Sequence, residues 1–354
     1  MKTSKTINKL IIFLITLTVV SCTKDNPEPL IPISEKYDNG IFVTCEGNFN
    51  SANGSLSFIS DDGVVENNIF NSVNGFPLGD VVQSITIIDT IAYIVVNNSG
   101  KVVVADAGTM QYISEIPVTT PDHMTAISND VAYVSDWNAF SANGFVHVID
   151  LKTNEITNSI QVGHQPGEIL YSNGYVFVIE SGVWPDAGNS ISVINVESET
   201  VVENIIVETN PINMALNENV LWVLSKGETG YDENWQEISV TPGSLTSINT
   251  TSLQVNNVIE LHEGKIPRGL VCNNNLLYFR NGQTIFSQSA DASKLNAIEI
   301  ITGNFNNEII YYNDHIYSAY VPSYDQSGEV YKFSSSGILE NTFQVGIAPG
   351  NFGF

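Results

Sequence analysis

Four related stretches of sequence decide the fold, and they read PDHMTAISNDVAYVSDW (121–137), PGEILYSNGYVFVIESG (166–182), PINMALNENVLWVLSKG (211–227) and PRGLVCNNNLLYFRNG (267–282). Each opens with a proline and continues as an apolar strand, a polar turn and a second strand with one large aromatic residue. The first three prolines are 45 residues apart, and the aromatic residue follows each of the four prolines after 11 or 12 positions. A repeat of about 45 residues is typical of a four-stranded β-propeller blade.

The remainder of each repeat predicts two further strands. The stretches FVHVIDLKTNEITNSIQV (145–162) and ISVINVESETVVENIIV (191–207) consist of alternating Val and Ile runs on either side of a polar turn. Such alternation indicates a β-hairpin. After residue 22 no segment keeps a 3.6-residue apolar period, so the domain is expected to be nearly free of helix.

The number of repeats predicts seven blades. Residues 81–118 form a second unit, the four prolines open the third to sixth, and residues 306–345 form the seventh. The first unit begins at GIFVTCEGN (40–48) and lacks an innermost strand, whereas PGNFGF (349–354) repeats a proline-opened first strand. We therefore predict an all-β, seven-bladed propeller over 40–354. Its ring is closed by the C-terminal strand pairing beside Ile41–Cys45, which removes the free edges.

The N-terminus resembles that of a bacterial lipoprotein precursor. Three lysines precede the uncharged run 10–20, and a small residue, Ser21, stands directly before Cys22. This pattern predicts a signal peptide over 1–21 and lipidation of Cys22, with 22–39 as a flexible, proline-containing tether. An ordinary N-terminal helix is the alternative. We expect an outer-membrane protein, attached by its lipid alone and facing the cell exterior.

Composition excludes several classes of function. The chain has 13 basic and 38 acidic residues, a formal charge of −25, and so offers no surface for nucleic-acid phosphates. After Cys22 only Cys45 and Cys272 remain, without metal-type spacing, and both are expected as buried strand thiols, with a disulfide between them as the alternative. No catalytic triad order or nucleotide-binding motif is present. We expect neither a cofactor nor a resident metal, and no enzymatic activity.

Several stretches resemble one group of propellers. They include CEGNFNSANGSLSFI (45–59), NGFPLGDVVQSITI (74–87), VHVIDLKTNEITNSIQVGHQPGEI (146–169) and VGIAPGNFGF (345–354). Their pattern is similar to YncE-like seven-bladed lipoproteins of Bacteroidota, including the BtuG-type proteins that capture vitamin B12 at the cell surface. The resemblance implies capture of a corrinoid and its transfer to a TonB-dependent outer-membrane transporter. Cys45, where such sequences often carry Asn, and an insertion of 11 residues in the fifth unit depart from that pattern.

Long aromatic loops join the second and third strands of several repeats and are expected to share one face, opposite short turns such as 152–154. Loop length and exposed aromatic residues together indicate a binding surface. With the polar residues beside them, the predicted ligand-binding set is Phe49, Asp136, Trp137, Phe140, Glu180, Trp184, Tyr231, Trp235, Arg268 and Tyr324. The alternative for the aromatic members is packing within the loops, and for Arg268 a salt bridge between blades.

Polar residues at the ends of second strands are expected to occupy equivalent positions around the mouth of the channel: Glu46, Asn97, Asp136, Glu180 and Lys226. Three functions remain open at this stage. A ligand-capturing surface lipoprotein is the first, and a protein- or glycan-binding module is the second. A propeller hydrolase or lyase is the third, and it requires a divalent ion near Glu46, Asp136 and Glu180.

Overall fold

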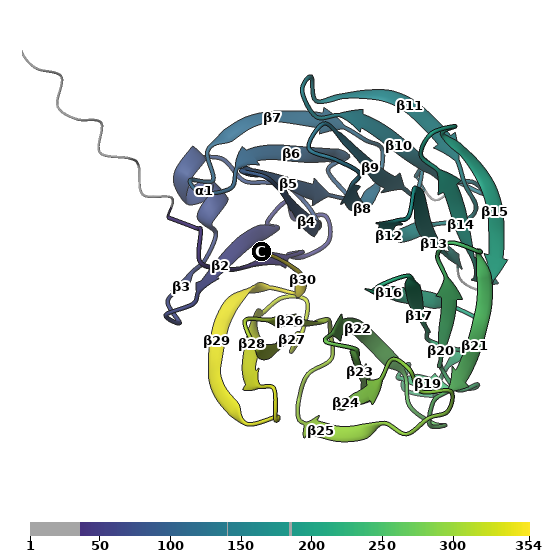
Figure 1. The fold of residues 1–354 in the computed structure, drawn as a ribbon. Helices are drawn as coiled ribbons and strands as arrows, with labels where there is room; N and C mark the ends of the chain where they lie inside the picture. Colours follow the sequence, from purple (N-terminus) through teal and green to yellow (C-terminus); the bar gives the residue numbers. More distant parts are fainter. Residues whose placement is uncertain (1–35, 140, 184–185) are drawn as a thin grey trace, which may run out of the picture. The chain divides into compact units, whose positions relative to one another are not determined.

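The described part of the chain forms a seven-bladed β-propeller, as predicted. A computed structural model describes residues 36–139, 141–183 and 186–354. Within these ranges lie seven four-stranded antiparallel sheets. Figure 1 shows the sheets around a common centre, with the proline-opened or equivalent strand of each sheet innermost. The two-residue side-chain period places alternate residues of each strand on opposite faces, where they pack against the two neighbouring blades.

The blades follow the order of the repeats. From the axis outward, blades 1 to 4 are β30 (Pro349–Gly353), β1 (Gly40–Cys45), β2 (Ser55–Ser60) and β3 (Val65–Glu66); β4 (Val82–Ile88), β5 (Ile91–Val96), β6 (Lys101–Asp106) and β7 (Tyr112–Pro117); β8 (Pro121–Ala126), β9 (Val131–Asp136), β10 (Phe145–Asp150) and β11 (Glu155–Gln161); and β12 (Pro166–Ser172), β13 (Tyr175–Val183), β14 (Asp186–Asn195) and β15 (Thr200–Ile206).

Blades 5 to 7 are β16 (Pro211–Asn217), β17 (Val220–Ser225), β20 (Ser244–Asn249) and β21 (Gln254–Glu260); β22 (Pro267–Asn273), β23 (Leu276–Asn281), β24 (Thr284–Ser289) and β25 (Ile298–Thr302); and β26 (Ile309–Tyr312), β27 (His315–Tyr320), β28 (Ser327–Ser334) and β29 (Leu339–Ile347). Blade 5 also carries an inserted hairpin, β18 (Thr229–Tyr231) and β19 (Glu237–Ser239). One short helix, α1 (Ile69–Asn74), buries Ile69 and Phe70 between blades 1 and 2.

The C-terminal strand closes the ring. Strand β30 pairs antiparallel with β1, with Val43 opposite Phe352 and Cys45 opposite Pro349. The Asn351 amide donates to Thr44 Oγ1 at 2.9 Å, which adds a side-chain link to the ladder. Phe352 is only 7% exposed and packs in one cluster with Val330 and Phe343 of blade 7. The last residues therefore join the seventh blade to the first, as the repeat count predicts.

Loops on the two faces of the ring differ in length. The connections between second and third strands lie on the same face as the connections between successive blades. The reason is that the first residue of a first strand pairs with a residue at the end of the second strand, as Pro121 does with Asp136 and Pro166 with Glu180. The other two turns of each blade, such as 107–111, lie on the opposite face. We call these the long-loop face and the short-turn face.

The described chain enters at the short-turn face. The Lys36 amide donates to the Gly108 carbonyl at 2.8 Å, and the Asp61 amide donates to the Asn39 carbonyl at 3.0 Å. Tyr37 is buried, with its ring 5.1 Å from that of Phe58. The sequence assigned Tyr37 to the tether, but its ring covers the apolar end of blade 1. The packed domain therefore begins a few residues before the expected boundary at 40.

The predicted signal peptide and Cys22 lie outside the described residues, so lipidation stays a prediction. Among residues 36–354, apart from the gaps at 140 and 184–185, no helix has the length and apolar character needed to cross a bilayer.

Ring closure can be tested by removing the closing strand. Phe352→Ala should lower the free energy of unfolding by about 3 to 5 kcal/mol, the usual effect of truncating a buried Phe. Phe354→Ala, which changes a side chain that is 62% exposed, should cost less than about 1 kcal/mol. A chain ending at Ala348 should be destabilised more than either. Thermal and urea melts of the four proteins measure this, and equal stability of the truncated and full chains would contradict the closure.

Candidate functional site

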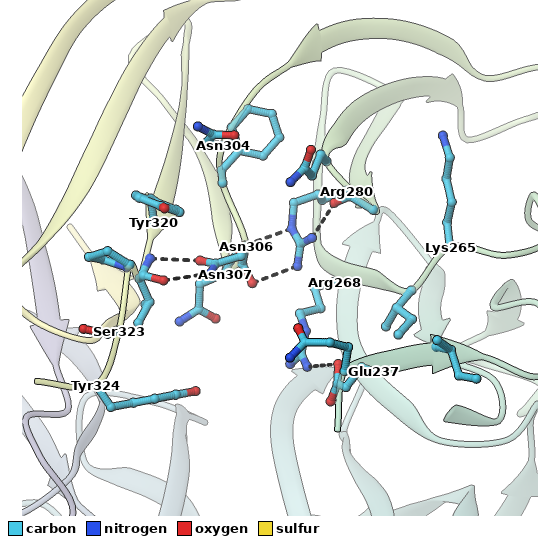
Figure 2. Close-up of a pocket in the computed structure, with 18 of the residues that line it drawn as sticks. Glu237, Lys265, Arg268, Arg280, Asn304, Asn306, Asn307, Tyr320, Ser323 and Tyr324 are labelled. Carbon is cyan, nitrogen blue, oxygen red and sulfur yellow. Dashed lines mark hydrogen bonds and ion pairs between the residues drawn. The ribbon is translucent and has the colours of Figure 1, made fainter. Parts of the chain in front are cut away.

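A large trough lies on the long-loop face over blades 5 to 7. In blade 6 only Gly282 and Gln283 separate β23 from β24, whereas blade 5 inserts a hairpin and blade 7 has the long loop 321–326. The short hairpin between two long loops leaves a cavity of about 1140 Å³ (Figure 2). The sequence drew attention to long loops, but here the short one creates the space.

The inserted hairpin of blade 5 presents Trp235 at one wall of the trough. Asp232 Oδ1 accepts the amides of Asn234 and Gln236 at 2.8 and 2.9 Å, and this tight turn holds Trp235 at φ 61°. A bulky residue rarely adopts a positive φ, and such outliers cluster at functional sites. Trp235 is 81% exposed, with Tyr231 as its aromatic neighbour at 6.1 Å between ring centroids. The turn therefore holds a large apolar ring out in solvent.

The opposite wall comes from blade 7 and is held by side-chain amides. Asn306 Nδ2 donates to the Val321 carbonyl at 2.8 Å, and the Val321 amide donates back to Asn306 Oδ1 at 2.8 Å. Asn48 of blade 1 donates to the Tyr324 carbonyl. The Tyr324 side chain is 69% exposed and lines the trough. Both walls thus present a flat aromatic ring from a backbone fixed by hydrogen bonds.

Both arginines of the chain line the trough. Arg268 and Arg280 are opposite each other in the ladder between β22 and β23. Arg280 is 4% exposed, and its guanidinium donates to the carbonyls of Asn306 at 3.0 Å and Gly282 at 2.5 Å. Burial, together with the nearby Arg268 charge, lowers the pKa of Arg280 to about 10. Arg280 is therefore a built-in cation whose hydrogen bonds go to neutral groups.

Arg268 is more accessible and shares a carboxylate with a lysine. Arg268 Nη2 lies 3.2 Å from Glu237 Oε2, and Lys226 Nζ lies 3.2 Å from Glu237 Oε1. Burial alone would raise the pKa of Glu237, but Arg268 and Lys226 together lower it. Glu237, carried by the insertion, thus remains ionised between the two cations.

A second cavity of about 520 Å³ lies on the axis of the ring. Its polar lining has a regular origin, because several lining residues stand two positions after a blade-opening proline, namely His123, Glu168, Asn213 and Asn351. Glu46 and Glu308 complete an acidic lining, and Arg268 and Asn307 border both cavities. The cationic trough therefore continues into an acidic channel.

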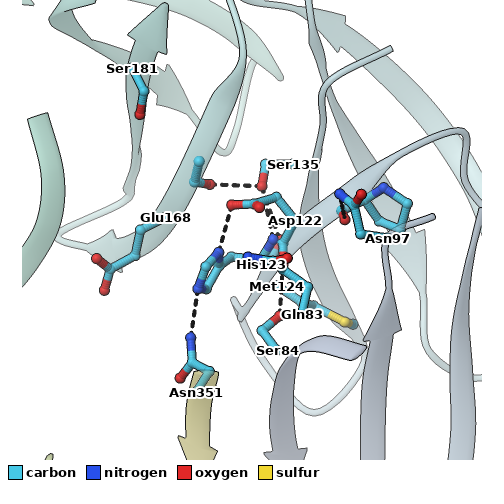
Figure 3. A network of polar contacts seen from close by, with 12 residues as sticks. Gln83, Ser84, Asn97, Asp122, His123, Met124, Ser135, Glu168, Ser181 and Asn351 are labelled. Atoms are coloured by element: carbon cyan, nitrogen blue, oxygen red, sulfur yellow. Dashed lines mark hydrogen bonds and ion pairs between the residues drawn. The ribbon is translucent and has the colours of Figure 1, made fainter. Parts of the chain in front are cut away.

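His123 of blade 3 contacts the closing strand of blade 1 inside the channel. Its Nδ1 lies 2.7 Å from Asp122 Oδ2, and its Nε2 meets the Asn351 amide group of β30 at 2.8 Å (Figure 3). Burial alone would lower the pKa of His123, but the charges of Asp122, Glu168 and Glu308 raise it to about 9. The raised pKa favours the protonated ring, which donates from both nitrogens, so in that state the Asn351 side chain accepts at Nε2 through its amide oxygen. The contact links the closing strand to blade 3.

A second network spans blades 4, 5 and 7. Asn213 Nδ2 donates to Glu308 Oε2 at 3.2 Å, and Glu168 Oε2 accepts the Met214 amide at 2.8 Å. Asn213 of blade 5 can contact blade 7 because blade 6, which lies between them, has Gly269 at the equivalent position and so no side chain there. Gly269 has φ 64°, and a Cβ at this position would lie 3.0 Å from the Ile309 nitrogen. Burial raises the pKa of Glu168 to about 7.

Asp136 and Glu180 do not belong to the rim that the sequence suggested. Asp136 and Glu180 each pair with the proline that opens their blade. In blades 1 and 5 the residues that pair with the proline are Cys45 and Ser225, so Glu46 and Lys226 lie one residue beyond the paired position. A shift of one residue turns a strand side chain to the opposite face. The five residues are therefore not equivalent.

The two buried carboxylates instead hold turns together. Asp136 is 1% exposed and accepts the amides of Thr120 and Asn138 at 2.8 Å, with His147 Nε2 at 3.0 Å. Glu180 accepts the Gly163 amide at 2.7 Å and the hydroxyls of Ser190 and Ser192. Neither residue lines the trough or the channel.

The other predicted ligand-binding residues divide into four groups. Trp235, Arg268 and Tyr324 meet in the trough, and Trp137 lines the channel. Phe49 and Tyr231 are exposed on loops of the same face. Phe140 and Trp184 lie outside the described residues. Contact of any of them with a ligand stays a prediction.

Several lining residues were missed by reading long loops alone. Arg280 belongs to a strand end, and Glu168, Asn213 and Asn351 belong to first strands. For the three first-strand residues the signal is the phase of the repeat, because each stands two positions after a blade-opening proline and lines the channel. Among the described residues, no three His, Cys, Asp or Glu side chains are grouped so that they could hold a metal ion.

Comparison with known proteins agrees with this architecture. The family profile described as "Domain of unknown function (DUF5074)" matches residues 39–345. None of the curated proteins matches the sequence.

Solved structures that resemble the chain are remote in sequence. A quinonprotein alcohol dehydrogenase-like protein from Bacteroides thetaiotaomicron has 14% identity and a TM-score of 0.65, with 89% of this chain and 78% of that chain covered. The periplasmic gluconolactonase of Pseudomonas aeruginosa has 10% identity and a TM-score of 0.61, with 88% and 98% covered. Apo AztD from Citrobacter koseri has 9% identity and a TM-score of 0.54, with 89% and 97% covered. At these identities the likeness shows the fold alone.

The raised pKa of His123 makes stability pH-dependent. A folded-state pKa of about 9, against an ordinary 6.5, means that the protonated ring stabilises the fold below pH 6.5 and that this stabilisation is lost as the pH rises through 9. Urea unfolding at pH 7 and pH 10 should therefore show a loss in the wild type that is smaller in His123→Gln. The same loss in both proteins would show that the ring is not charged in the folded state.

Proposed function

Because the chain belongs to the DUF5074 family, whose function its description leaves open, we propose from the site that it is a ligand-capturing propeller and that the trough over blades 5 to 7 is its binding site. The observation that carries this proposal is the trough itself. Two long loops, each ordered by hydrogen bonds, enclose about 1140 Å³ and hold Trp235 and Tyr324 in solvent. Ligand sites are concave, with flat apolar surfaces and a few fixed polar groups.

Binding accounts for the site better than catalysis does. The carboxylates that a metal-dependent hydrolase or lyase would need, Asp136 and Glu180, are fully engaged in turns. The trough offers guanidinium, amide and aromatic groups, which recognise a ligand. A bulky ligand with polar edges fits this lining, and the sequence resemblance makes a corrinoid the first candidate.

We place this function at the outer membrane, with the domain attached through lipid on Cys22 and facing the cell exterior. A TonB-dependent transporter is the expected recipient of the captured ligand. Support for this placement comes from the predicted signal peptide and from the resemblance, and an adjacent transporter gene would add to it.

Calorimetric titration of the purified full chain with cyanocobalamin tests capture. Replacing residues 228–241 by an Asn-Gly turn, or Trp235 by Ala, should weaken binding at least about tenfold, which is about 1.4 kcal/mol, because one wall of the trough is lost. Ile338→Ala removes another exposed apolar side chain, on the short-turn face, and should leave affinity unchanged. Absence of binding would rule out cyanocobalamin as the ligand. Binding with the same affinity in the trough variants and the wild type would show that the site lies outside the trough.

Lipid attachment has its own test. Cys22→Ala should abolish labelling of the expressed chain with a radioactive fatty acid and release it from the membrane fraction, because the thiol that carries the lipid is gone. Cys272→Ala is the control and should be labelled like the wild type. Labelling of Cys22→Ala would refute the anchor.

A further inference from the structure

The trough is a cationic patch in a strongly acidic protein. Its lining contains Lys265, Arg268 and Arg280 against a single carboxylate, Glu237, which gives three positive charges minus one, a net charge of +2. The whole chain has a formal charge of −25. Of the two cavities that the described residues line, the trough is therefore the one that favours an anion.

Arg268 already holds a carboxylate that a ligand could replace. Glu237 lies on the inserted hairpin, is partly exposed and meets Arg268 through one contact at 3.2 Å. Arg268 is itself 36% exposed, so a bound anion can approach its guanidinium from solvent. Arg280 stands behind it as a fixed charge, since carbonyl groups accept its hydrogen bonds.

The rest of the lining suits a sugar. Trp235 and Tyr324 face the cavity from opposite walls and provide flat surfaces for sugar rings. Gln236, Gln283 and Asn304 supply amides for hydroxyl groups. Below Arg268 and Asn307 the lining changes to carboxyl groups, from Glu46, Asp122, Glu168 and Glu308, so the two arginines lie at the mouth and not along the channel.

We propose that the trough binds an acidic saccharide, with Arg268 holding a carboxylate or sulfate group of the sugar in place of Glu237. This inference rests on the proposed capture function and names the class of ligand. A guanidinium fork binds a planar carboxylate or a sulfate through two parallel hydrogen bonds.

Calorimetry of the full chain with three oligosaccharides of equal length tests the inference: an oligogalacturonate, a sulfated heparin fragment and an uncharged galacto-oligosaccharide. The first two distinguish carboxylate from sulfate. Arg268→Gln should weaken binding of the preferred acidic probe about 10- to 100-fold, since a charged hydrogen bond contributes about 1.5 to 3 kcal/mol. Glu237→Gln should strengthen it several-fold by removing the internal competitor. Arg268→Lys should fall between Arg268→Gln and the wild type.

Lys152→Gln is the control, because it also removes one positive charge, but on the short-turn face. It should bind like the wild type, and thermal melts should show all variants folded. Equal affinity of Arg268→Gln and wild type, equal binding of the uncharged probe, or no binding of either acidic probe overturns the inference. Cyanocobalamin binding that Trp235→Ala weakens and Arg268→Gln does not would leave capture standing while the acidic saccharide is rejected.

Discussion

Pairing between the first and last strands of the chain is the interaction on which the rest of the structure depends. Each blade has two apolar faces, and both are covered only when it has a neighbour on each side. Val43 and Phe352 supply the one junction that chain continuity does not. The closing strand β30 also contacts residues that line the two cavities. Its Asn351 meets His123 in the channel, and Asn307, which borders both cavities, donates to the Pro349 carbonyl at 2.8 Å.

Repetition made the fold predictable, whereas the site depends on departures from repetition. A proline followed at a fixed distance by an aromatic strand residue reveals the length of the repeat. A domain that starts on the second strand of a blade and ends on a first strand implies that these two strands pair and close the ring. The trough arises where blade 6 shortens its hairpin to Gly282 and Gln283 between two lengthened neighbours. No single loop carries that signal; it appears only when three consecutive blades are compared.

Strand register explains the errors in the predicted rim. Asp136 and Glu180 look like Glu46 and Lys226 in the sequence, since all stand at strand ends. One residue of offset decides whether such a side chain holds buried turns, as Asp136 and Glu180 do, or leaves them, as Glu46 does to line the channel. The first strands of blades 1, 3, 4 and 5 all carry a similar bulge, so the bulge does not distinguish these residues. The offset lies in the repeat itself, because Asp136 and Glu180 follow the aromatic residue of their strand by three positions and Lys226 follows Trp222 by four.

The entry of the chain at the short-turn face has a consequence for how the domain is presented. Whatever precedes Lys36 is joined to the domain beside Gly108, on the side away from the trough. A lipid carried by Cys22, as we propose, would therefore be connected to the domain through the short-turn face. The long-loop face, with the trough, would be free of the attachment point, so a transporter could contact the loops around the bound ligand without displacing the anchor.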